Sequence, residues 1–285
     1  MESALNAIFE ILSFGAIIIL IVLGLGVIAS MMGIFNFAHG EFVLLGAYTT
    51  YLFYKSGLPI WLGMLAAPVV LAVIGFALER TIIRRFYLAP IVAMLATYAL
   101  GLAIRETVRG LIGGLYISIP EPFVGSFVIA GVQLSKWRLA IIVVTALVMV
   151  ASYLLLTRTT FGLRVRASLE NPALARASGI STNTIYAITF AFGAALAGLA
   201  GALVVPVFSL FADLGIRFLI QGFLAVMLGG VGTFEGPVAG AGVIGTLSAA
   251  LPWAIAPVLA DVMVFIIAIV IVKLRPGGLI NGRRV

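Results

Sequence analysis

The chain has 285 residues, of which 63% are hydrophobic, whereas an average soluble domain contains about 45–50% apolar residues. This excess excludes a soluble globular protein and indicates an integral membrane protein, because spans of about 20 residues each leave no length for a soluble domain. The formal net charge of +7 would suggest a nucleic-acid partner in a soluble chain, but the placement of the basic residues explains it better, so we expect no nucleic-acid partner.

The composition also limits the chemistry. Cysteine is absent and histidine occurs once, which excludes disulfide bonds and thiolate metal sites and gives no indication of a metal centre. The sequence has no Gly-x-x-x-x-Gly-Lys-Ser/Thr loop for a nucleotide, and no Ser/His/Asp set or paired carboxylates at catalytic spacing. We therefore expect a non-catalytic protein that binds neither a metal nor a cofactor, and active transport would need an ion gradient or a separate ATPase.

The apolar segments set the fold class. In chain order they are 8–31, 41–55, 58–78, 89–108, 137–156, 184–205, 217–232, 237–256 and 258–274. The segments at 41–55 and 217–232 are short for a full crossing, and each lies beside a glycine-rich break. The sequence thus predicts one all-α, polytopic integral membrane domain over residues 1–285, with about eight to ten transmembrane segments including broken or re-entrant helices. Small residues at helical spacing in 193–201 and 236–245 predict close helix contact, either within the chain or with another subunit, and packing within the chain is favoured.

The first break, residues 33–41, reads Gly-Ile-Phe-Asn-Phe-Ala-His-Gly-Glu and holds the chain's one histidine. Asn36 is placed to cap a helix that begins near His39 by accepting an N–H bond. Glu41 then lies near the first turn of that helix, where the helix dipole favours a carboxylate. Irregular backbone and ionisable side chains at membrane depth have to face protein or a wet cavity, so the break is a candidate part of a translocation pathway.

The second break, residues 229–237, reads Gly-Gly-Val-Gly-Thr-Phe-Glu-Gly-Pro and also carries a carboxylate among glycines. Its likeness to the first break hints at an internal repeat. We predict that Glu235 lies across the pathway from the first break as the other half of a gate. The alternative is that each break is a tight helix hairpin whose polar groups cap each other. The candidate pathway residues are Asn36, His39, Glu41, Thr233 and Glu235.

The connection at 109–136 is predicted to form a small extracytoplasmic cap. Alternating residues at 116–119 and at 127–129, separated by two prolines, indicate short strands and turns. On the helix before it, three charged residues lie on one face and are expected to pair near the outer interface, namely Arg105, Glu106 and Arg109. Three further charged residues are candidates for an outer vestibule: Asp213, Arg217 and Asp261.

The most polar stretch of the chain is the loop at 158–183, between two long apolar segments. Helix formers at 163–169 run into Glu170-Asn171-Pro172, where the sequence predicts a break because the residue before a proline avoids the helical region. Asn171 is placed to cap a second helix with Pro172 at its first position. Gly179 is placed to end that helix.

Two functions are open for this loop, which is predicted to be cytoplasmic. It is either an ordinary loop whose arginines only set the orientation of the chain, or a docking elbow for a soluble protein. A flexible linker needs no capped helix, proline break and glycine stop, so we favour docking, and docking favours a separate ATPase as the energy source. Apolar anchors are expected at Leu163, Val165, Leu169, Leu174 and Ile180, while the arginines face water or a partner. The candidate coupling residues are Gly162, Arg164, Arg166, Glu170, Asn171, Pro172, Arg176 and Gly179.

The basic residues also predict the orientation. Eleven of the 17 fall on one side of the scheme and mark that side as cytoplasmic by the positive-inside rule. They are Arg80, Arg84, Arg85, Arg158, Arg164, Arg166, Arg176, Lys273, Arg275, Arg283 and Arg284. The C-terminus is then inside and the N-terminus outside. The first residues carry no basic n-region, so we expect the first apolar segment to be retained.

Several motifs, in order over residues 33 to 279, resemble those of branched-chain amino acid ABC transporter permeases. The first is Asn36-Phe37-Ala38-His39-Gly40-Glu41 followed by Leu45-Gly46-Ala47-Tyr48. The second is Gly162-Leu163-Arg164-Val165-Arg166-Ala167 with Asn171-Pro172-Ala173 and Ser178-Gly179-Ile180. Leu228-Gly229-Gly230-Val231-Gly232-Thr233 with Gly236-Pro237, and Arg275-Pro276-Gly277-Gly278-Leu279, complete the set. Urea and short-amide permeases share these motifs, and the run at 46–51 fits them at least as well.

The resemblance implies the first, shorter permease type of a bacterial inner-membrane importer for branched-chain or other hydrophobic amino acids. It implies as partners a second related permease, two ABC ATPase subunits that bind ATP and Mg²⁺, a periplasmic substrate-binding protein and the surrounding membrane lipid. It assigns the coupling role to residues 162–180. The alternatives are the same type of permease for urea or short-chain amides, and a stand-alone channel or secondary carrier for a small neutral solute.

Overall fold

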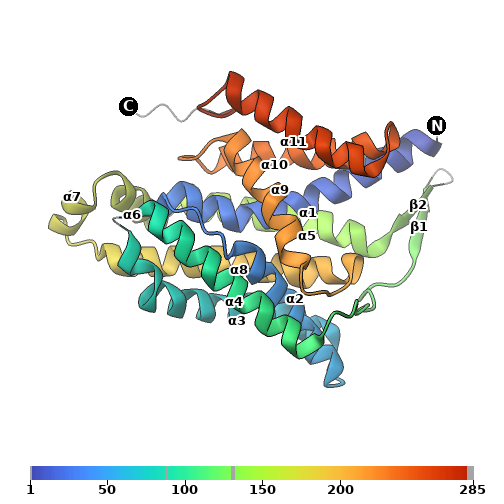
Figure 1. Ribbon diagram of the computed structural model, residues 1–285, viewed down its shortest axis with the longest axis horizontal. Helices are drawn as coiled ribbons and strands as arrows, with labels where there is room; N and C mark the ends of the chain where they lie inside the picture. Colours follow the sequence, from blue (N-terminus) through green and yellow to red (C-terminus); the bar gives the residue numbers. More distant parts are fainter. Residues whose placement is uncertain (1, 88, 130–131, 281–285) are drawn as a thin grey trace.

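The computed structural model describes residues 2–87, 89–129 and 132–280, and these ranges are mainly helical (Figure 1). The long helices are α1 (Glu2–Met32), α3 (Ile60–Thr81), α4 (Pro90–Ile112), α5 (Lys136–Arg158), α8 (Thr182–Phe208) and α11 (Pro257–Leu274). The shorter helices are α2 (His39–Lys55), α6 (Thr160–Glu170), α7 (Pro172–Ala177), α9 (Leu214–Gly229) and α10 (Glu235–Ala250). Two 3₁₀ turns are η1 (Ile83–Phe86) and η2 (Leu251–Trp253).

Within the described ranges, the six long helices are each apolar enough to cross a membrane. Among them lie the shorter apolar helices α2, α9 and α10, with 17, 16 and 16 residues. α2 and α9 are the two short segments that the sequence predicted beside its breaks. The all-α, polytopic membrane fold with broken helices is therefore confirmed.

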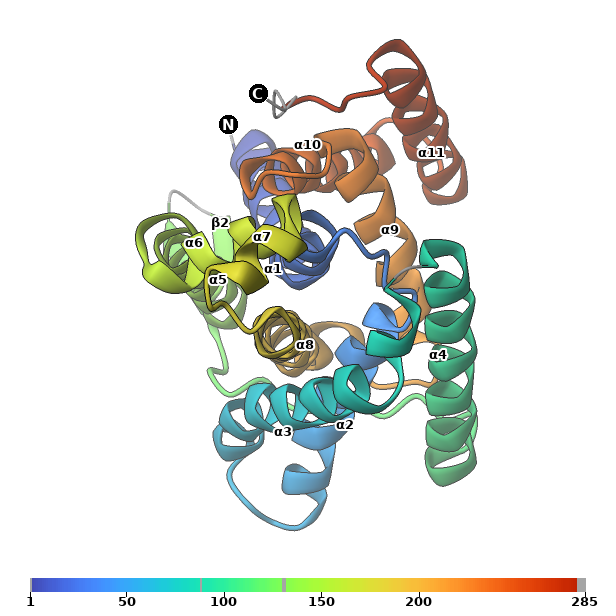
Figure 2. The ribbon, with the colours of Figure 1, turned by 90° about the vertical axis from the view of Figure 1, so that its left-hand side faces the viewer.

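Two helices form the centre of the molecule and the others surround them. Figure 2 shows α1 and α8 inside a ring made by α3, α4, α5, α10 and α11. The apolar stretches of α1 and α8 are each 72% buried, whereas those of α3, α4, α5 and α11 are between 17% and 28% buried. The outer helices therefore expose apolar side chains that need lipid or another subunit to cover them.

The chain follows the same path twice, in opposite directions. α2 and α3 pack on each other and on α8, and in the same way α9 and α10 pack on each other and on α1. α1 runs from the end that holds the strands towards the end that holds α6 and α7, while α8 runs back (Figure 1). The units α1–α4 and α8–α11 are thus related as an inverted repeat, an arrangement common among transporters.

Two glycine pairs lie where the repeat units cross. A Cβ on Gly24 would lie 2.5 Å from the Gly193 carbonyl oxygen, and one on Gly193 would lie 2.9 Å from the Gly24 carbonyl oxygen. Gly40 and Gly215 meet in the same reciprocal way, each against the backbone of the other. Such mutual contacts are the signature of a two-fold relation. The predicted close packing of the run at 193–201 within the chain is confirmed, because Gly198 meets α3 and Gly201 meets α2.

The internal repeat at which the two glycine-rich breaks hinted is present in the helices, but the two breaks are not equivalent positions of it. Because the second unit runs in the opposite direction but in the same order, the α1–α2 break corresponds to the α8–α9 connection at 209–213. The α9–α10 break at 230–234 corresponds to the α2–α3 turn at 56–59. The likeness of the two breaks in sequence therefore reflects the local needs of tight helix turns, in which glycines with positive φ, such as Gly33 and Gly230, recur.

The two ends of the molecule carry different structures. At one end a hairpin pairs β1 (Ser126–Ile129) with β2 (Val132–Ser135) in antiparallel register, which confirms the strand predicted at 127–129. The other predicted strand, 116–119, forms only the isolated bridge between Ile117 and Leu210. At the opposite end lie α6 and α7 (Figure 1). That the hairpin end is extracytoplasmic stays a prediction.

Candidate functional site

Three groups of polar residues come together in the structure, and the first is the α1–α2 break. α1 ends at Met32, and Gly33 turns the backbone with φ of +68°. The side-chain oxygen of Asn36 accepts a bond from the Ala38 N–H at 3.0 Å, and the Phe37 N–H donates to the Thr97 hydroxyl of α4 at 3.1 Å. The N-cap of α2 is Ala38 and has no side-chain cap bond. Asn36 therefore braces the turn before the helix, and its predicted role as the cap is wrong.

His39 is fully buried at the start of α2. Its Nε2 donates to the Ile21 carbonyl oxygen of α1 at 3.1 Å. The ring fits because Gly24 has no side chain, since a Cβ there would lie 2.8 Å from the His39 Cε1 atom. The histidine thus fastens α2 to the central helix, and a role in a gate stays a prediction.

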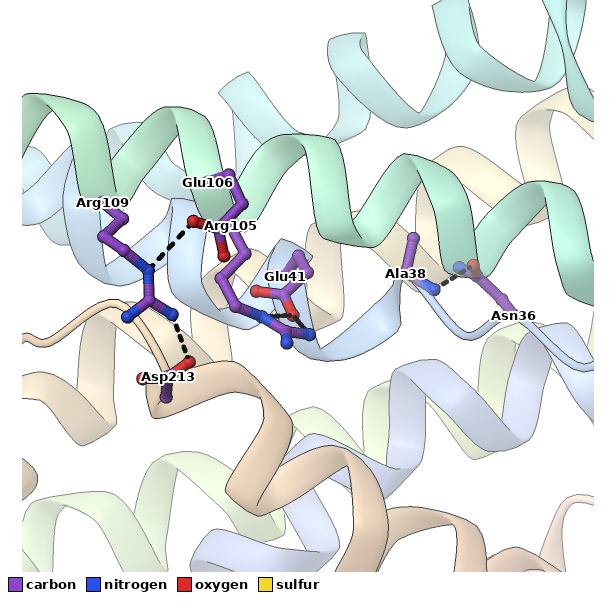
Figure 3. A network of polar contacts seen from close by, with 7 residues as sticks. All are labelled: Asn36, Ala38, Glu41, Arg105, Glu106, Arg109 and Asp213. Carbon is purple, nitrogen blue, oxygen red and sulfur yellow. Dashed lines mark hydrogen bonds and ion pairs between the residues drawn. The ribbon is translucent and has the colours of Figure 1, made fainter.

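Glu41 forms a buried ion pair that joins α2 to α4 (Figure 3). One of its oxygens accepts from Arg105 Nη2 at 2.5 Å and from Arg105 Nε at 2.9 Å. The exposed fractions of the two side chains are 0% for Glu41 and 12% for Arg105. A charge this deeply buried is tolerated only while it is paired, so this contact holds α4 at the break.

Arg109 continues the network one turn further along α4 (Figure 3). It pairs with Glu106 at 3.1 Å and with Asp213, in the α8–α9 connection, at 2.8 Å. The predicted pairing within α4 is confirmed for Glu106 and Arg109 but is wrong for Arg105, which turns to Glu41 because α4 packs on α2 at that turn. The other two vestibule candidates are separate: Arg217 lies over the Phe208 ring at 5.6 Å, and Asp261 is exposed on α11.

The second break lies in a turn of its own. Thr233 accepts a bond from the Gly236 N–H at 3.1 Å. The segment after α11 closes the turn, since the Leu279 N–H donates to the Leu228 carbonyl at 2.8 Å. Glu235 is exposed in the first turn of α10. Over the described ranges, no hydrogen bond or ion pair joins Thr233 or Glu235 to the polar group of the first break, so a gate between the two breaks stays a prediction.

The second candidate site is the elbow formed by α6 and α7. Thr159 accepts from the Gly162 N–H at 3.4 Å at the start of α6, and Asn171 accepts from the Leu174 N–H at 3.0 Å at the start of α7. Pro172 occupies the first position of α7. The predicted break, cap and second helix are therefore confirmed.

The end of α7 confirms the predicted glycine stop. Gly179 has φ of +82°. Its N–H donates to the Arg176 carbonyl at 3.0 Å, and the Ile180 N–H donates to the Ala175 carbonyl at 3.0 Å. These two bonds are the Schellman arrangement, in which a left-handed glycine ends a helix. The elbow is thus a pair of short helices, each capped at its start, and not an irregular linker.

The side chains of the elbow are placed in part differently from the prediction. Val165 is buried, but Leu163 and Leu174 are 60% and 62% exposed and are not anchors. Arg166 is half-buried and donates to the Leu156 carbonyl oxygen at the end of α5, so its guanidinium has a partner within the chain. Position 162 has to be glycine, because a Cβ at this position would collide with the same Leu156 carbonyl oxygen. Exposed charged side chains of the elbow are Arg164, Glu170 and Arg176.

A third group of polar residues, at the elbow end of the membrane helices, was missed by the sequence analysis. It consists of Glu79, Tyr87 and Tyr186, linked to the elbow at Ser168. Glu79 alone gave a signal, because it is an acidic residue directly after the apolar segment at 58–78. The two tyrosines follow no pattern in the sequence, since they lie 99 positions apart and only the fold joins them.

Comparison with known proteins assigns this architecture. Residues 7–272 match the family described as branched-chain amino acid transport system, permease component. The chain belongs to this family. It is thus a transport subunit of the ABC permease type and a multi-pass membrane protein.

Individual relatives match over nearly the whole chain. The permease protein BraD of the high-affinity branched-chain amino acid transport system of Pseudomonas aeruginosa is 30% identical over 95% of this chain and 93% of its own length. The corresponding LivH protein of Escherichia coli strain K12 is 25% identical over 97% of this chain and 95% of its own length. A probable LivH permease of Methanocaldococcus jannaschii is 29% identical over 81% of this chain and 76% of its own length.

Proposed function

We propose that this chain is the translocating subunit of a bacterial inner-membrane ABC importer for branched-chain or other hydrophobic amino acids. Two separate ATPase subunits that bind ATP and Mg²⁺ drive it, a second related permease completes the membrane part, and a periplasmic binding protein delivers the solute. The relatives named for high-affinity branched-chain amino acid transport support the substrate class. The observation that carries the proposal is the elbow.

The exposed face of the elbow suits a groove on a soluble protein. Leu163 and Leu174 present apolar side chains beside the exposed arginines Arg164 and Arg176. Burying a leucine side chain is favourable by about 1.5–3 kcal/mol, and arginine forms charge-assisted hydrogen bonds with carboxylates. A short helix pair with both kinds of group is the form that helix-in-groove recognition uses. This face is therefore the docking surface for the ATPase.

The orientation follows from the same assignment. ATP is in the cytoplasm, so α6 and α7 are on the cytoplasmic side together with the basic residues of the α3–α4 turn. α11 runs towards that side and α1 starts at the opposite one (Figure 1). The C-terminus is then cytoplasmic, the N-terminus periplasmic, and the hairpin faces the binding protein.

The α1–α2 break supplies polar groups at membrane depth for the solute to pass. Glu41, Arg105 and Thr97 lie between α2 and α4 in the interior of the helix bundle, where ionisable groups are functional by default. A zwitterion or a neutral solute passes such a paired site without binding tightly, which suits delivery from a high-affinity binding protein.

The experiment is reconstitution of the chain with its second permease and both ATPases in proteoliposomes. The cognate binding protein is assayed with leucine, isoleucine, valine, urea and acetamide. We expect ATP-dependent uptake of the three amino acids. Uptake of urea or acetamide in place of the amino acids would instead favour a permease for urea or short-chain amides. Uptake by the chain alone, without ATPases, would show a channel or carrier and not an ABC importer.

A further inference from the structure

A chain of four residues links the elbow to the membrane helices. Tyr87, in the turn between η1 and α4, donates its hydroxyl to Glu79 of α3. Its ring meets the ring of Tyr186 on α8 edge-on, with centroids 5.0 Å apart and planes at 64°. The Tyr186 hydroxyl donates to the carbonyl oxygen of Ser168 on α6 at 2.6 Å. Four elements are thus joined in one line.

The contact at Ser168 has a cause in the sequence. In a continuous helix this carbonyl would accept a bond from the N–H of residue 172, which is Pro172 and has none. The break that shapes the elbow therefore leaves a carbonyl without its helical partner, in a residue that is fully buried. Tyr186 supplies the missing donor, and the elbow is tied to α8 at the point where α6 ends.

The contact between Tyr87 and Glu79 is also buried. Glu79 is 1% exposed, and burial raises the pKa of the Tyr87 hydroxyl above its usual range, with the Glu79 contact adding to the shift. Tyr87 stays protonated and continues to donate. Over the described ranges, the second Glu79 oxygen and the Ser168 hydroxyl meet no hydrogen-bond partner. The cluster therefore holds unused polar atoms that allow a second pairing if the elbow shifts.

Tyr87 lies three positions before Pro90, the first residue of α4, and α4 is lightly held. Its main contacts are with α2 and η1, and most of its side chains are exposed. Through Thr97 and Arg105 it touches the α1–α2 break. A helix with few packing contacts moves readily as a rigid body. Moving its elbow end therefore displaces the groups that hold the break.

We propose that Tyr186 and Tyr87 are positioning residues for transport, which connect the ATPase-docking elbow to α4 and so to the polar break. The inference rests on the proposed function, since it needs the elbow to be moved by an ATPase. Neither tyrosine touches the solute. Both act by fixing how far a displacement of α6 is passed on to the turn before α4.

The test compares Tyr186→Phe and Tyr87→Phe with wild type in the reconstituted complex with its ATPases and binding protein. Leucine uptake and ATP hydrolysis are measured in the same proteoliposomes. We expect about five-fold less leucine taken up per ATP in each variant, the size of effect of one lost net hydrogen bond, with normal assembly. The double variant should be no worse than either single one, because one connection is cut twice. Tyr98→Phe, exposed on α4, is the matched control.

A second pair of variants separates positioning from stability. Glu79→Gln keeps an oxygen that accepts from Tyr87 and should keep the wild-type leucine uptake per ATP. Glu79→Leu removes that oxygen and should lower the uptake per ATP. The inference would be overturned if the tyrosine variants took up as much leucine per ATP hydrolysed as wild type. It would also be overturned if they only assembled less well, while the complex that did assemble kept the wild-type uptake per ATP. A wild-type complex without ATP-dependent uptake would instead overturn the proposed function, and the inference with it.

Discussion

Two arginines one turn apart on α4 differ in what they contribute. Arg105 pairs with the fully buried Glu41, while Arg109 pairs with Glu106 and Asp213, whose side chains are about half exposed. Exposed ion pairs are typically worth about 0–1 kcal/mol because water screens them. A buried pair is different, because removing one partner leaves a charge without compensation in a medium of low dielectric constant.

The first prediction follows from this contrast. Arg105→Ala should destabilise the permease by about 3–5 kcal/mol, because it strands the Glu41 carboxylate, whereas Arg109→Ala should cost about 1 kcal/mol or less. Thermal unfolding and yield of the purified complex measure both. Equal losses of stability in the two variants would show that the buried Glu41–Arg105 pair contributes no more than the exposed pairs of Arg109.

The second prediction concerns His39 and Glu235. His39→Ala removes a buried ring that hydrogen-bonds α1, so it should lower assembly while the assembled complex transports at the normal rate. Glu235→Gln changes an exposed side chain and should leave assembly unchanged. Assembly, basal hydrolysis and uptake are scored separately. Normal assembly with altered uptake in both variants would instead favour the gate between the two breaks.

At the scale of elements, the elbow is the proposed docking surface for the ATPase. The third prediction is that Arg164→Glu with Arg176→Glu uncouples hydrolysis from uptake and leaves the membrane fold intact. Each lost charge-assisted contact costs about 1.5–3 kcal/mol, enough to weaken ATPase docking ten-fold or more. Copurification of the ATPase and the uptake rate measure the effect. Arg85→Glu, exposed outside the elbow, is the matched control, and wild-type uptake in the double variant would exclude docking at this face.

Local signals explain why the elbow was predictable in detail. Its break, cap and stop depend on proline, asparagine and glycine at fixed spacings, and each acts within five residues. The exposure of Leu163 and Leu174 was not predictable, because an apolar side chain in a loop is as consistent with an anchor as with a docking surface. Similarly, the partner of Glu41 lies 64 positions away on α4, and only tertiary packing brings Arg105 to it.

At the scale of the whole molecule, the inverted repeat places equivalent helices at opposite depths. α2 and α9 cross at Gly40 and Gly215, so each unit contributes a short helix to the interior. The two units differ in their ends: the α3–α4 turn carries the tyrosine connection to the elbow, whereas η2 and its neighbours line an open cavity of about 430 Å³ beside Asn6 and Glu10. The fold is thus symmetric in its helices, and its two ends differ in structure.

The last prediction tests the orientation of the whole molecule. The chain has no cysteine, so a single introduced one reports its own side of the membrane without further changes. Ser178 at the end of α7 and Ser118 near the hairpin are exposed, whereas Ser168 is fully buried and would not react from either side. Ser178→Cys should be labelled by a membrane-impermeant maleimide only in inside-out vesicles, and Ser118→Cys only in right-side-out ones, because the excess of basic residues predicts a cytoplasmic elbow side. The reverse pattern would place the elbow where no ATPase can reach it and would remove the basis of the proposed function.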